Sequence, residues 1–571
     1  MADVLSGELN KRDLLLQKRG VVGQMYNERS KFEKTWKDLS RYISPDHGRF
    51  GEENGGREGR RRDGYLINPF PVNAVKKCAA GLHSGLTSPS RPWFKLGLAD
   101  KEKAEFHSIR RWLDDCEEVM RSIYARGNTY QMLFNIDAEL PQFGTAAALM
   151  FEDFDYGLWH RAFTCGEYAG AVDARGRVVM FARRFSMPAY AMVKEFGKEN
   201  VSQMVLNAFE RRDVNSRFAV EMLVEENGDF DPQSPFGFGN FPWKSFYWEM
   251  GGSERFLKVA GYCEKPFIMP RWETVANEVY GVGCGHAALG DCMQLQKLER
   301  NKLRAVDNEC DPPMVMPASL RGVDRNAGGN NYVPDGLQVH AYRLVPPGHE
   351  NYAGILELIR EKQDLIGAAF YNDLFMMLGS GDVPQMTARE VAERHEEKLL
   401  LLGPVLEQMH NEVLEPLTMR CFGICKRNGL LPEQPEEVGD DELKVSFISL
   451  LAQAQEMIAL PALERTVTFT SNLASVSPEA LDVINFDAVV RKHAVINGTP
   501  EELLRSEEEV EEIRKQRAEQ QAQQAQQEQM LQMAAPAKDL AQAAESAKRA
   551  GVTEEQGLDA VIGGGGGEGI L

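Results

Sequence analysis

The feature that most constrains the fold is one long helical stretch in the carboxy-terminal half of the chain. Thr387-Ala-Arg-Glu390 is a capping box, and helix-forming residues continue from it to Lys426-Arg427, with Gly429 as the stop signal. About 41 residues at roughly 1.5 Å each give a length on the order of 60 Å. Pro404 and Pro416 are expected to kink this helix. A helix of this length exceeds the needs of one compact domain and indicates a subunit of a larger assembly.

The first 265 residues predict a mixed α+β body. Amphipathic patterns predict helices over residues 8–44, 72–86 and 103–126. Short apolar runs separated by turn residues then predict strands at 147–151, 158–163, 167–172 and 178–182. A helical segment is predicted at 187–211, followed by strands near 218–225 and 255–262. With 571 residues, the chain has room for three or four such domains.

The second half has a different order of elements. Residues 273–308 predict a helix that ends at Asp311-Pro312-Pro313, and residues 352–370 predict another. Between them, in residues 314–347, short strand-forming runs alternate with turn residues, which predicts a small β insert. After the long helix the sequence predicts a short strand at 443–448, helical segments over 451–496 and 501–549, and a glycine-rich tail.

Charge and hydropathy narrow the function classes. The net charge of −20 argues against a protein that grips nucleic acid, because phosphate neutralisation needs a basic face. The same charge is compatible with a protein that lets a polyanion slide past without binding it. No apolar run is long enough to cross a bilayer and no secretory signal precedes the first helix, so we expect a protein made in a reducing cytoplasm. The nine scattered cysteines are then expected to form no disulfides.

Candidate catalytic and metal-binding motifs all fail on spacing. His395-Glu396 lacks a second histidine one helical turn on, because position 399 is Leu. Gly281-Val-Gly283-Cys-Gly285-His286 has His where a dinucleotide fingerprint needs its third glycine, so we expect these glycines to slim or bend a helix against another backbone. Gly81 stands three residues before Ser84 rather than two, which is wrong for a nucleophile elbow. Cysteines 284, 292, 421 and 425, with His286, form no paired four-ligand pattern and are expected to lie in helix cores. A phosphate loop is absent from the sequence, and we expect neither an enzyme nor a cofactor.

Several stretches, taken in order, resemble the head-to-tail connector, or portal, proteins of short-tailed bacteriophages. They are residues 80–96 (Ala-Gly-Leu-His-Ser-Gly-Leu-Thr-Ser-Pro-Ser-Arg-Pro-Trp-Phe-Lys-Leu), Phe143-Gly-Thr-Ala146, the 271–310 helix, Thr387-Ala-Arg-Glu-Val391 with Gly403-Pro404, and Ser446-Phe-Ile-Ser-Leu-Leu-Ala452. The resemblance spans roughly residues 10–500.

The resemblance implies a multidomain α+β fold with portal-like wing, stem, clip and crown, long helices, a small β insert and ring-forming subunits. Its parts would be a wing over 1–270, stem helices at 271–308 and 350–369, a clip at 309–349 and a tunnel loop at 370–386. A long helix and strand over 387–450 would link wing to crown, a crown and possible helical barrel would occupy 451–549, and 550–571 would be a flexible tail.

The resemblance also implies a function. Such proteins form a dodecameric ring at one capsid vertex, through which a separate terminase ATPase pumps double-stranded DNA that is later ejected. A tail adaptor docks at the clip, and capsid and scaffold proteins surround the ring. The implied location is the virion, after assembly in the bacterial host cytoplasm, without a membrane. An acidic wall would repel phosphates and keep the DNA moving.

Three sets of residues follow from this resemblance as candidate sites. The tunnel loop would ring the narrowest point with Met376, Met377, Gly379, Ser380, Gly381, Asp382, Val383 and Pro384. The stem would present Lys297, Arg300, Lys302 and Arg304 to the DNA backbone, although surface ion pairs are an equally good reading. The clip would offer partners Pro312, Pro313, Arg321, Arg325, Asn330, Tyr332 and Arg343.

Two other classes stay open. The first is a structural scaffold or adaptor of a large assembly, in which long helices mediate contacts without a DNA channel. The second is an enzyme whose pocket shows no motif. A ring with a pore wide enough for duplex DNA separates the portal from the scaffold, and bound metal or nucleotide in the purified protein would reveal the enzyme.

Overall fold

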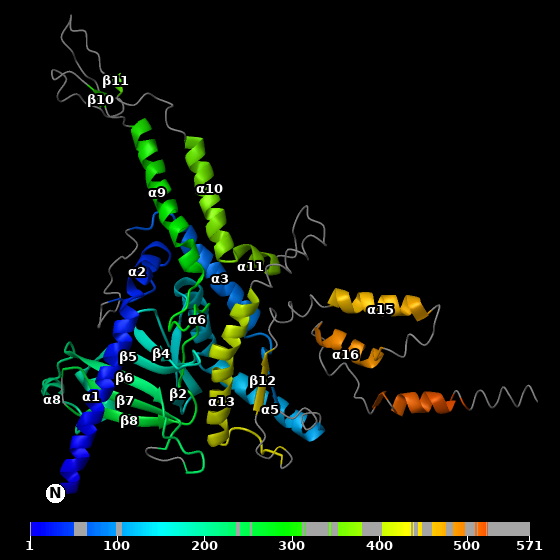
Figure 1. Cartoon of the computed structure of the whole chain (residues 1–571), viewed down its shortest axis with the longest axis horizontal. Helices are drawn as coiled ribbons and strands as arrows, with labels where there is room; N and C mark the ends of the chain where they lie inside the picture. Colours follow the sequence, from blue (N-terminus) through cyan, green and yellow to red (C-terminus); the bar gives the residue numbers. More distant parts are fainter. Residues whose placement is uncertain are drawn as a thin grey trace, which may run out of the picture. The chain divides into compact units, whose positions relative to one another are not determined.

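The computed structural model describes residues 2–50, 65–98, 106–235, 240–251, 254–310, 314–315, 342–343, 352–379, 402–435, 438, 443–447, 460–474, 484–496, 509–510, 512–520 and 522. The chain divides into two compact units, residues 1–459 and 460–571. Within the first unit, helices surround two main antiparallel sheets (Figure 1). The predicted α+β class is confirmed.

The larger sheet has five strands in the order β4-β5-β6-β7-β8, each paired with its neighbour in sequence. Their bounds are β4 Tyr168–Val172, β5 Val178–Pro188, β6 Arg217–Glu226, β7 Trp243–Glu249 and β8 Phe256–Tyr262. The smaller sheet has the order β3-β2-β9, with β2 Ala147–Asp153, β3 Gly157–Phe163 and β9 Phe267–Ile268. The strands predicted between residues 147 and 262 are therefore confirmed, and the sequence analysis missed β7 and β9.

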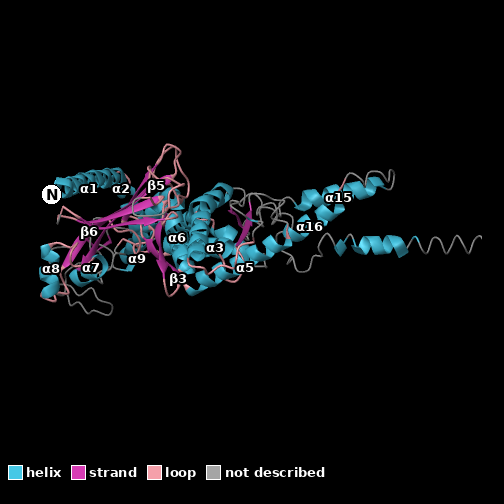
Figure 2. Cartoon of the chain, turned by 90° about the horizontal axis from the view of Figure 1, so that it is seen from below, coloured by secondary structure: helices cyan, strands magenta, loops and turns pink. Residues whose placement is uncertain are grey.

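Helices cover the larger sheet from two directions. Helix α1 (Ala2–Ser30) packs Leu15, Val22 and Met25 against sheet residues that include Leu223 and Trp248. Helices α7 (Ala189–Phe196) and α8 (Gln203–Glu210) build a separate apolar cluster with β5, β6 and β8. Figure 2 shows α1 along one side of these strands and α7 and α8 on the other. The sheet is thus buried on both sides.

A second core lies among helices α3 (Phe70–Leu86), α5 (His107–Arg126) and α6 (Thr129–Phe143) and the helical residues 402–427. Strand β1 (Phe94–Leu98) adds to it and pairs antiparallel with β12 (Leu443–Phe447), with Leu96 opposite Val445. This pairing joins segments about 350 residues apart in the sequence, so the first and last parts of unit 1 close on each other.

The helix predicted over residues 8–44 is two helices, α1 and α2 (Glu33–Tyr42). Arg29, in the last turn of α1, donates to the carbonyl oxygens of Gly166 at 2.6 Å and Tyr168 at 3.2 Å. Arg29 also pairs with Glu33 at 2.9 Å, so both helix ends are tied to the loop before β4. The helical segment predicted at 187–211 is also two helices, α7 and α8, which separate at Gly197.

Two long helices leave the body side by side: α9 (Cys284–Cys310) and α10 (Tyr352–Ala369) (Figure 1). Between them in sequence, β10 (Met314–Val315) pairs antiparallel with β11 (Tyr342–Arg343). The helix expected from residue 271 or 273 begins only at Cys284. Residues before it bind the segment between α6 and β2 instead, because Arg271 bridges to Thr145 and the amide of Trp272 donates to the Gly144 carbonyl at 2.9 Å.

The long predicted helix is described only from residue 402. Residues 402–409 are helical, a π-helical turn follows at His410–Leu414, and α13 runs over Glu415–Arg427. Pro416 lies in the first turn of α13, where its missing N–H and its bulky ring are best accommodated directly after a widened turn. The capping box at 387–390 lies outside the described residues.

The second unit contains α15 (Leu460–Ala474), α16 (Phe486–Ile496) and helical residues 512–520. Arg514 forms two hydrogen bonds to the Asp487 carboxylate, each 2.6 Å long, which fixes this last helical segment to α16. None of the helices in the described ranges combines the length and the apolar character needed to cross a membrane.

Candidate nucleic-acid interface

Helix α9 brings three of the four predicted stem cations onto one exposed face. Lys297, Arg300 and Arg304 are spaced i, i+3 and i+7, so they lie one above another along the helix. All three line a surface hollow of about 380 Å³, together with Tyr42, Met293, Gln296 and Asn301. Within the described part of the chain, none of the three forms an ion pair, and none of the lining residues is acidic. The hollow is therefore a cationic site in an acidic chain.

The fourth cation, Lys302, does not join this face. It pairs with Glu299, whose side chain is 9 % exposed, three residues earlier in α9. Residue 302 lies roughly 140° around the helix from Lys297, at 100° per residue. The sequence left two roles open for Lys302, contact with DNA or an ion pair. The structure contains the ion pair.

Buried polar side chains hold α9 in place beside the hollow. The Gln296 side chain accepts from the amides of Ile67 and Asn68, at 2.7 and 2.9 Å, and donates to the Asn68 carbonyl at 3.0 Å. Glu299 accepts from the Asn68 side chain at 2.8 Å. Both α9 residues are less than a tenth exposed. Because Gln296 and Glu299 are buried and these bonds satisfy them, the bonds fix the rotation of α9 about its axis, and with it the direction of the cationic face.

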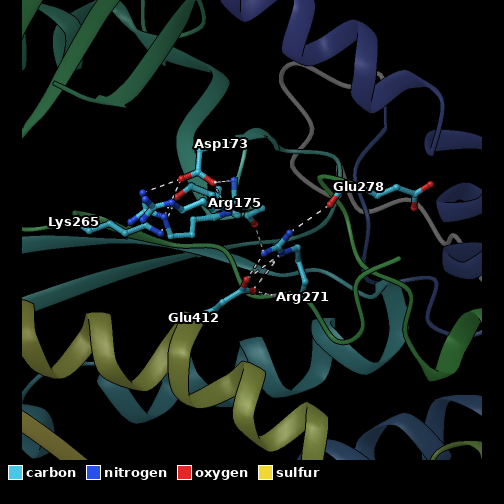
Figure 3. Close-up of polar contacts among 9 residues, drawn as sticks. Asp173, Arg175, Lys265, Arg271, Glu278 and Glu412 are labelled. Carbon is cyan, nitrogen blue, oxygen red and sulfur yellow. Dashed lines mark hydrogen bonds and ion pairs between the residues drawn. The ribbon is translucent and has the colours of Figure 1, made fainter. Parts of the chain in front are cut away.

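Arg271, in the segment that leads into α9, is the centre of a polar network (Figure 3). It is 5 % exposed and binds the Glu412 carboxylate of the π-helical turn through both its backbone amide and its guanidinium. The guanidinium also donates to the carbonyl of Gly176 at 2.7 Å and to that of Glu278 at 3.4 Å. One side chain therefore joins the β4–β5 turn, the base of α9 and the helical segment 402–427.

The neighbours of Arg271 complete the network. Asp173 accepts from the amides of Arg175 and Arg177, at 2.9 and 2.8 Å, which closes the β4–β5 turn and lowers the pKa of its carboxyl group (Figure 3). Lys265 donates to the Val178 carbonyl at 2.9 Å. Burial lowers the pKa of Lys265 to about 8. The network thus joins an exposed turn, closed by Asp173, to the buried Arg271, whose charge would be costly without a partner.

Glycines make the contact between the end of α6 and the start of α9. A Cβ on Gly281 would lie 2.5 Å from the Gly144 carbonyl oxygen, and one on Gly285 would lie 2.2 Å from that of Gln142. Gly144 itself has φ +75°, the left-handed conformation that ends α6. The predicted close approach of another backbone is confirmed, although Gly281 and Gly283 precede the helix rather than lie in it.

Replacing Gly283 by alanine tests this contact. The new Cβ would lie 2.5 Å from the Pro141 carbonyl oxygen, so one of the two backbones must move. We expect a loss of about 1–3 kcal/mol in the free energy of unfolding. The matched control is Gly290→Ala, inside α9, where the Cβ would meet nothing within 4 Å. It is expected to gain about 0.5–1 kcal/mol through helix propensity. Equal effects in urea unfolding would contradict the assignment.

The predicted tunnel-loop residues fall partly in a helix. Helix α11 covers Asn372–Gly379, so Met376, Met377 and Gly379 are helical where a loop over 370–386 was expected. Ser380, Gly381, Asp382, Val383 and Pro384 lie outside the described residues. The start of α11 is firmly held, because Phe375 packs directly on Gly81 of α3, where a Cβ would lie 2.1 Å from the ring.

Only one of the predicted clip residues has a described backbone. Arg343 lies in β11, opposite Met314 of β10. Pro312, Pro313, Arg321, Arg325, Asn330 and Tyr332 lie outside the described residues. The β10–β11 pair falls within the stretch where the sequence predicts a small β insert.

The near-miss motifs have structural roles. His286 accepts a hydrogen bond from the Gly283 amide at 3.1 Å at the start of α9, and burial lowers its pKa. The Ser84 hydroxyl donates to the Gly81 carbonyl of its own helix. Burial raises the pKa of the Cys284 and Cys292 thiols to about 12. His395 lies outside the described residues, and no metal-holding group of three or more His, Cys, Asp or Glu side chains occurs among those that are described.

Sequence reasoning missed the polar anchors Arg271, Gln296, Glu299 and Glu412. For Gln296 and Glu299 the sequence did hold a signal. Gln296 lies four residues after Cys292 and Glu299 four residues after Leu295, so both lie on the apolar stripe of α9. A polar side chain in such a stripe indicates a buried hydrogen bond. For Arg271 and Glu412, 141 residues apart, the sequence holds no comparable signal.

Comparisons with known proteins extend these observations. A family model described as bacteriophage head to tail connecting protein matches residues 17–504. A probable portal protein of Bordetella phage BPP-1 is 38% identical over 500 residues, which cover 87% of this chain and 89% of the relative. The portal protein of Salmonella phage epsilon15 is 35% identical over 513 residues, 88% of this chain and 90% of the relative. A chain in the neck of an empty gene transfer agent particle aligns with a TM-score of 0.35 and 12% identity, covering 79% of this chain and 97% of that one.

Proposed function

The chain belongs to the bacteriophage head to tail connecting protein family, and we propose that it is the subunit of a portal ring that passes double-stranded DNA. The observation that carries the proposal is the match to two phage portal proteins over nearly nine tenths of their length. Membership in this family makes the role structural. ATP hydrolysis in packaging would belong to a separate terminase.

The arrangement of unit 1 supports this role. An α+β body carries one long antiparallel helical hairpin, α9 and α10, interrupted by the β10–β11 pair. In the proposed ring the body is the wing, the hairpin is the stem and the β pair belongs to the clip. The net charge of −20 suits a passage through which DNA moves without being held.

The finer parts of the proposal concern partners. We propose a dodecamer at one capsid vertex of the virion, assembled in the host cytoplasm among capsid and scaffold proteins. Terminase docks during packaging, and a tail adaptor then binds the clip through the surface that includes Arg343. The residues from Met376 to Pro384 form the narrow ring around the DNA.

Three of the four predicted stem cations remain candidates for contact with DNA. Lys297, Arg300 and Arg304 share an exposed face, and a guanidinium or ammonium there suits a phosphate oxygen. Lys302 leaves the set because Glu299 pairs with it. The same face also suits an acidic protein surface, and charge reversal separates the two roles.

Loss of the protein tests the proposed function directly. In a phage that carries an early stop codon in this gene, we expect infected cells to contain capsid shells without DNA. Supplying the intact chain from a plasmid is expected to restore DNA-filled particles. Electron microscopy and nuclease-protected DNA measure both results. A scaffold protein gives a different outcome, because without it few shells form, and DNA-filled shells in the absence of the chain would overturn the portal role.

A further inference from the structure

The two helices of the α9–α10 hairpin expose faces of opposite charge. On α9 the face consists of Lys297, Arg300 and Arg304, called the cationic stripe below. On α10, Glu357, Glu361 and Asp364 are all exposed, and their spacing of i, i+4 and i+7 aligns them as an acidic stripe. Each stripe has one opposite charge at its edge, Asp307 and Arg360 respectively, so a net charge of the stated sign remains on each.

The stripes point away from the contact between the two helices. That contact is marked by Lys362, which donates to Asp291 at 3.0 Å, and by the buried Ile359 and Ile366 of α10. At 100° per residue, the centre of the cationic stripe lies roughly 150° around α9 from Asp291, and the centre of the acidic stripe lies roughly 130° around α10 from Lys362. The stripes are therefore too far apart to neutralise each other within one chain, and each is available to a partner.

We infer that in the assembled ring the cationic stripe of α9 packs on the acidic stripe of α10 from the next copy of the chain. This inference rests on the proposed ring, in which identical subunits meet through two different surfaces repeated around the axis. The partner is then a second copy, whose carboxylates enter the hollow lined by Lys297, Arg300 and Arg304.

The charges favour a second copy over DNA as the occupant. Each bound phosphate releases counterions and adds affinity, so three cations per subunit along the bore would make a ring that holds DNA rather than passes it. Cations placed at the seam are neutralised by carboxylates of the neighbour instead. The chain supplies three of each charge, in stripes of equal axial extent, seven residues from first to last. One seam then uses both exposed faces of the hairpin.

The seam also fixes an orientation. If the Asp291–Lys362 pair marks equal heights in the antiparallel hairpin, the centre of the cationic stripe lies about eight residues, or about 12 Å, beyond the acidic stripe along the axis. Neighbouring helices pack about 10 Å apart, so one hairpin repeat is about 20 Å wide and the hairpins must lean by about 30° from the ring axis to bring the stripes together.

A charge exchange tests the seam. The first variant is Arg300→Glu with Arg304→Glu, the second is Glu357→Lys with Glu361→Lys, and the third combines all four changes and keeps the net charge of the natural chain. We expect the first two each to lower the fraction of protein in rings by at least about tenfold, because like charges then face each other. The combined variant is expected to regain rings. Light scattering measures the fraction, and tryptophan fluorescence in urea checks that each subunit is folded.

The control and the contrary outcomes keep the possibilities apart. Arg110→Glu with Arg111→Glu makes the same change in net charge on exposed positions of α5 and is expected to leave ring formation unchanged. Ring formation by both of the first two variants would overturn the seam. If the Arg300→Glu, Arg304→Glu variant formed rings but failed to package DNA, the natural arginines would be assigned to contact with DNA. Folded combined variants that do not form rings would also overturn it. A natural chain that forms no ring at all would overturn the proposed function itself.

Discussion

Replacing Arg271 by methionine is expected to lower the free energy of unfolding by about 3–5 kcal/mol, because it leaves the Glu412 carboxylate without its partner in a largely buried position. The change also removes donors from the carbonyl oxygens of Gly176 and Glu278. The base of α9, the β4–β5 turn and the helical segment 402–427 lose their common contact. Urea unfolding followed by tryptophan fluorescence measures the effect, since all seven tryptophans lie between Trp36 and Trp272.

Two further variants separate the buried network from a general effect of losing an arginine. Arg12→Met breaks an ion pair with Glu254 in which both side chains are more than half exposed, and it is expected to cost less than about 1 kcal/mol. Arg271→Met combined with Glu412→Met removes both buried charges and is expected to recover much of the loss. If Arg271→Met were as mild as Arg12→Met, the network would not hold the stem base.

Deleting residues 379–382 is expected to leave ring assembly intact and to abolish most DNA packaging or retention. The deletion begins at the last residue of α11, a helix held to α3 by the Phe375–Gly81 contact, so the body keeps its anchor while the proposed narrow ring is shortened. This loss is expected because glycines at 379 and 381 would give the proposed ring backbone freedom, and methionines at 376 and 377 would offer apolar surface that holds no phosphate.

The matched control removes four residues from the glycine run at 563–566, where the resemblance places a flexible tail. It is expected to give normal numbers of DNA-filled particles. Nuclease-protected DNA per particle is the measurement for both deletions. Normal packaging by the 379–382 deletion would remove the role proposed for the loop, and a loss of rings would assign these residues to assembly.

Local patterns in the sequence predicted much of the fold. Turn residues at Asp155-Tyr-Gly157 and Ala174-Arg-Gly176 delimit strands that exist as β2–β5, because alternation and turn chemistry act over a few residues. The apolar stripe of α9 likewise predicted the helix that carries Lys297, Arg300 and Arg304. The resemblance to connector proteins predicted the family, which the comparisons confirm.

Contacts between distant residues could not be predicted in this way. The pairing of β1 with β12 and the Arg271–Glu412 pair depend on the closed fold, and no local period records them. The start of α9 was placed too early because residues 273–283 have helical composition, yet Gly281 and Gly283 of this stretch pack closely on the backbone at the end of α6. The spacing of Lys302 along the helix likewise did not predict that it forms an ion pair with Glu299.

The mass of the purified protein by light scattering, with the same fraction imaged by negative-stain electron microscopy, tests the channel most directly. The portal role predicts rings with a stain-filled central hole wide enough for duplex DNA, at about twelve times the 64.0 kDa of one chain. A filament, or a closed particle without a hole, would contradict the channel and favour a scaffold.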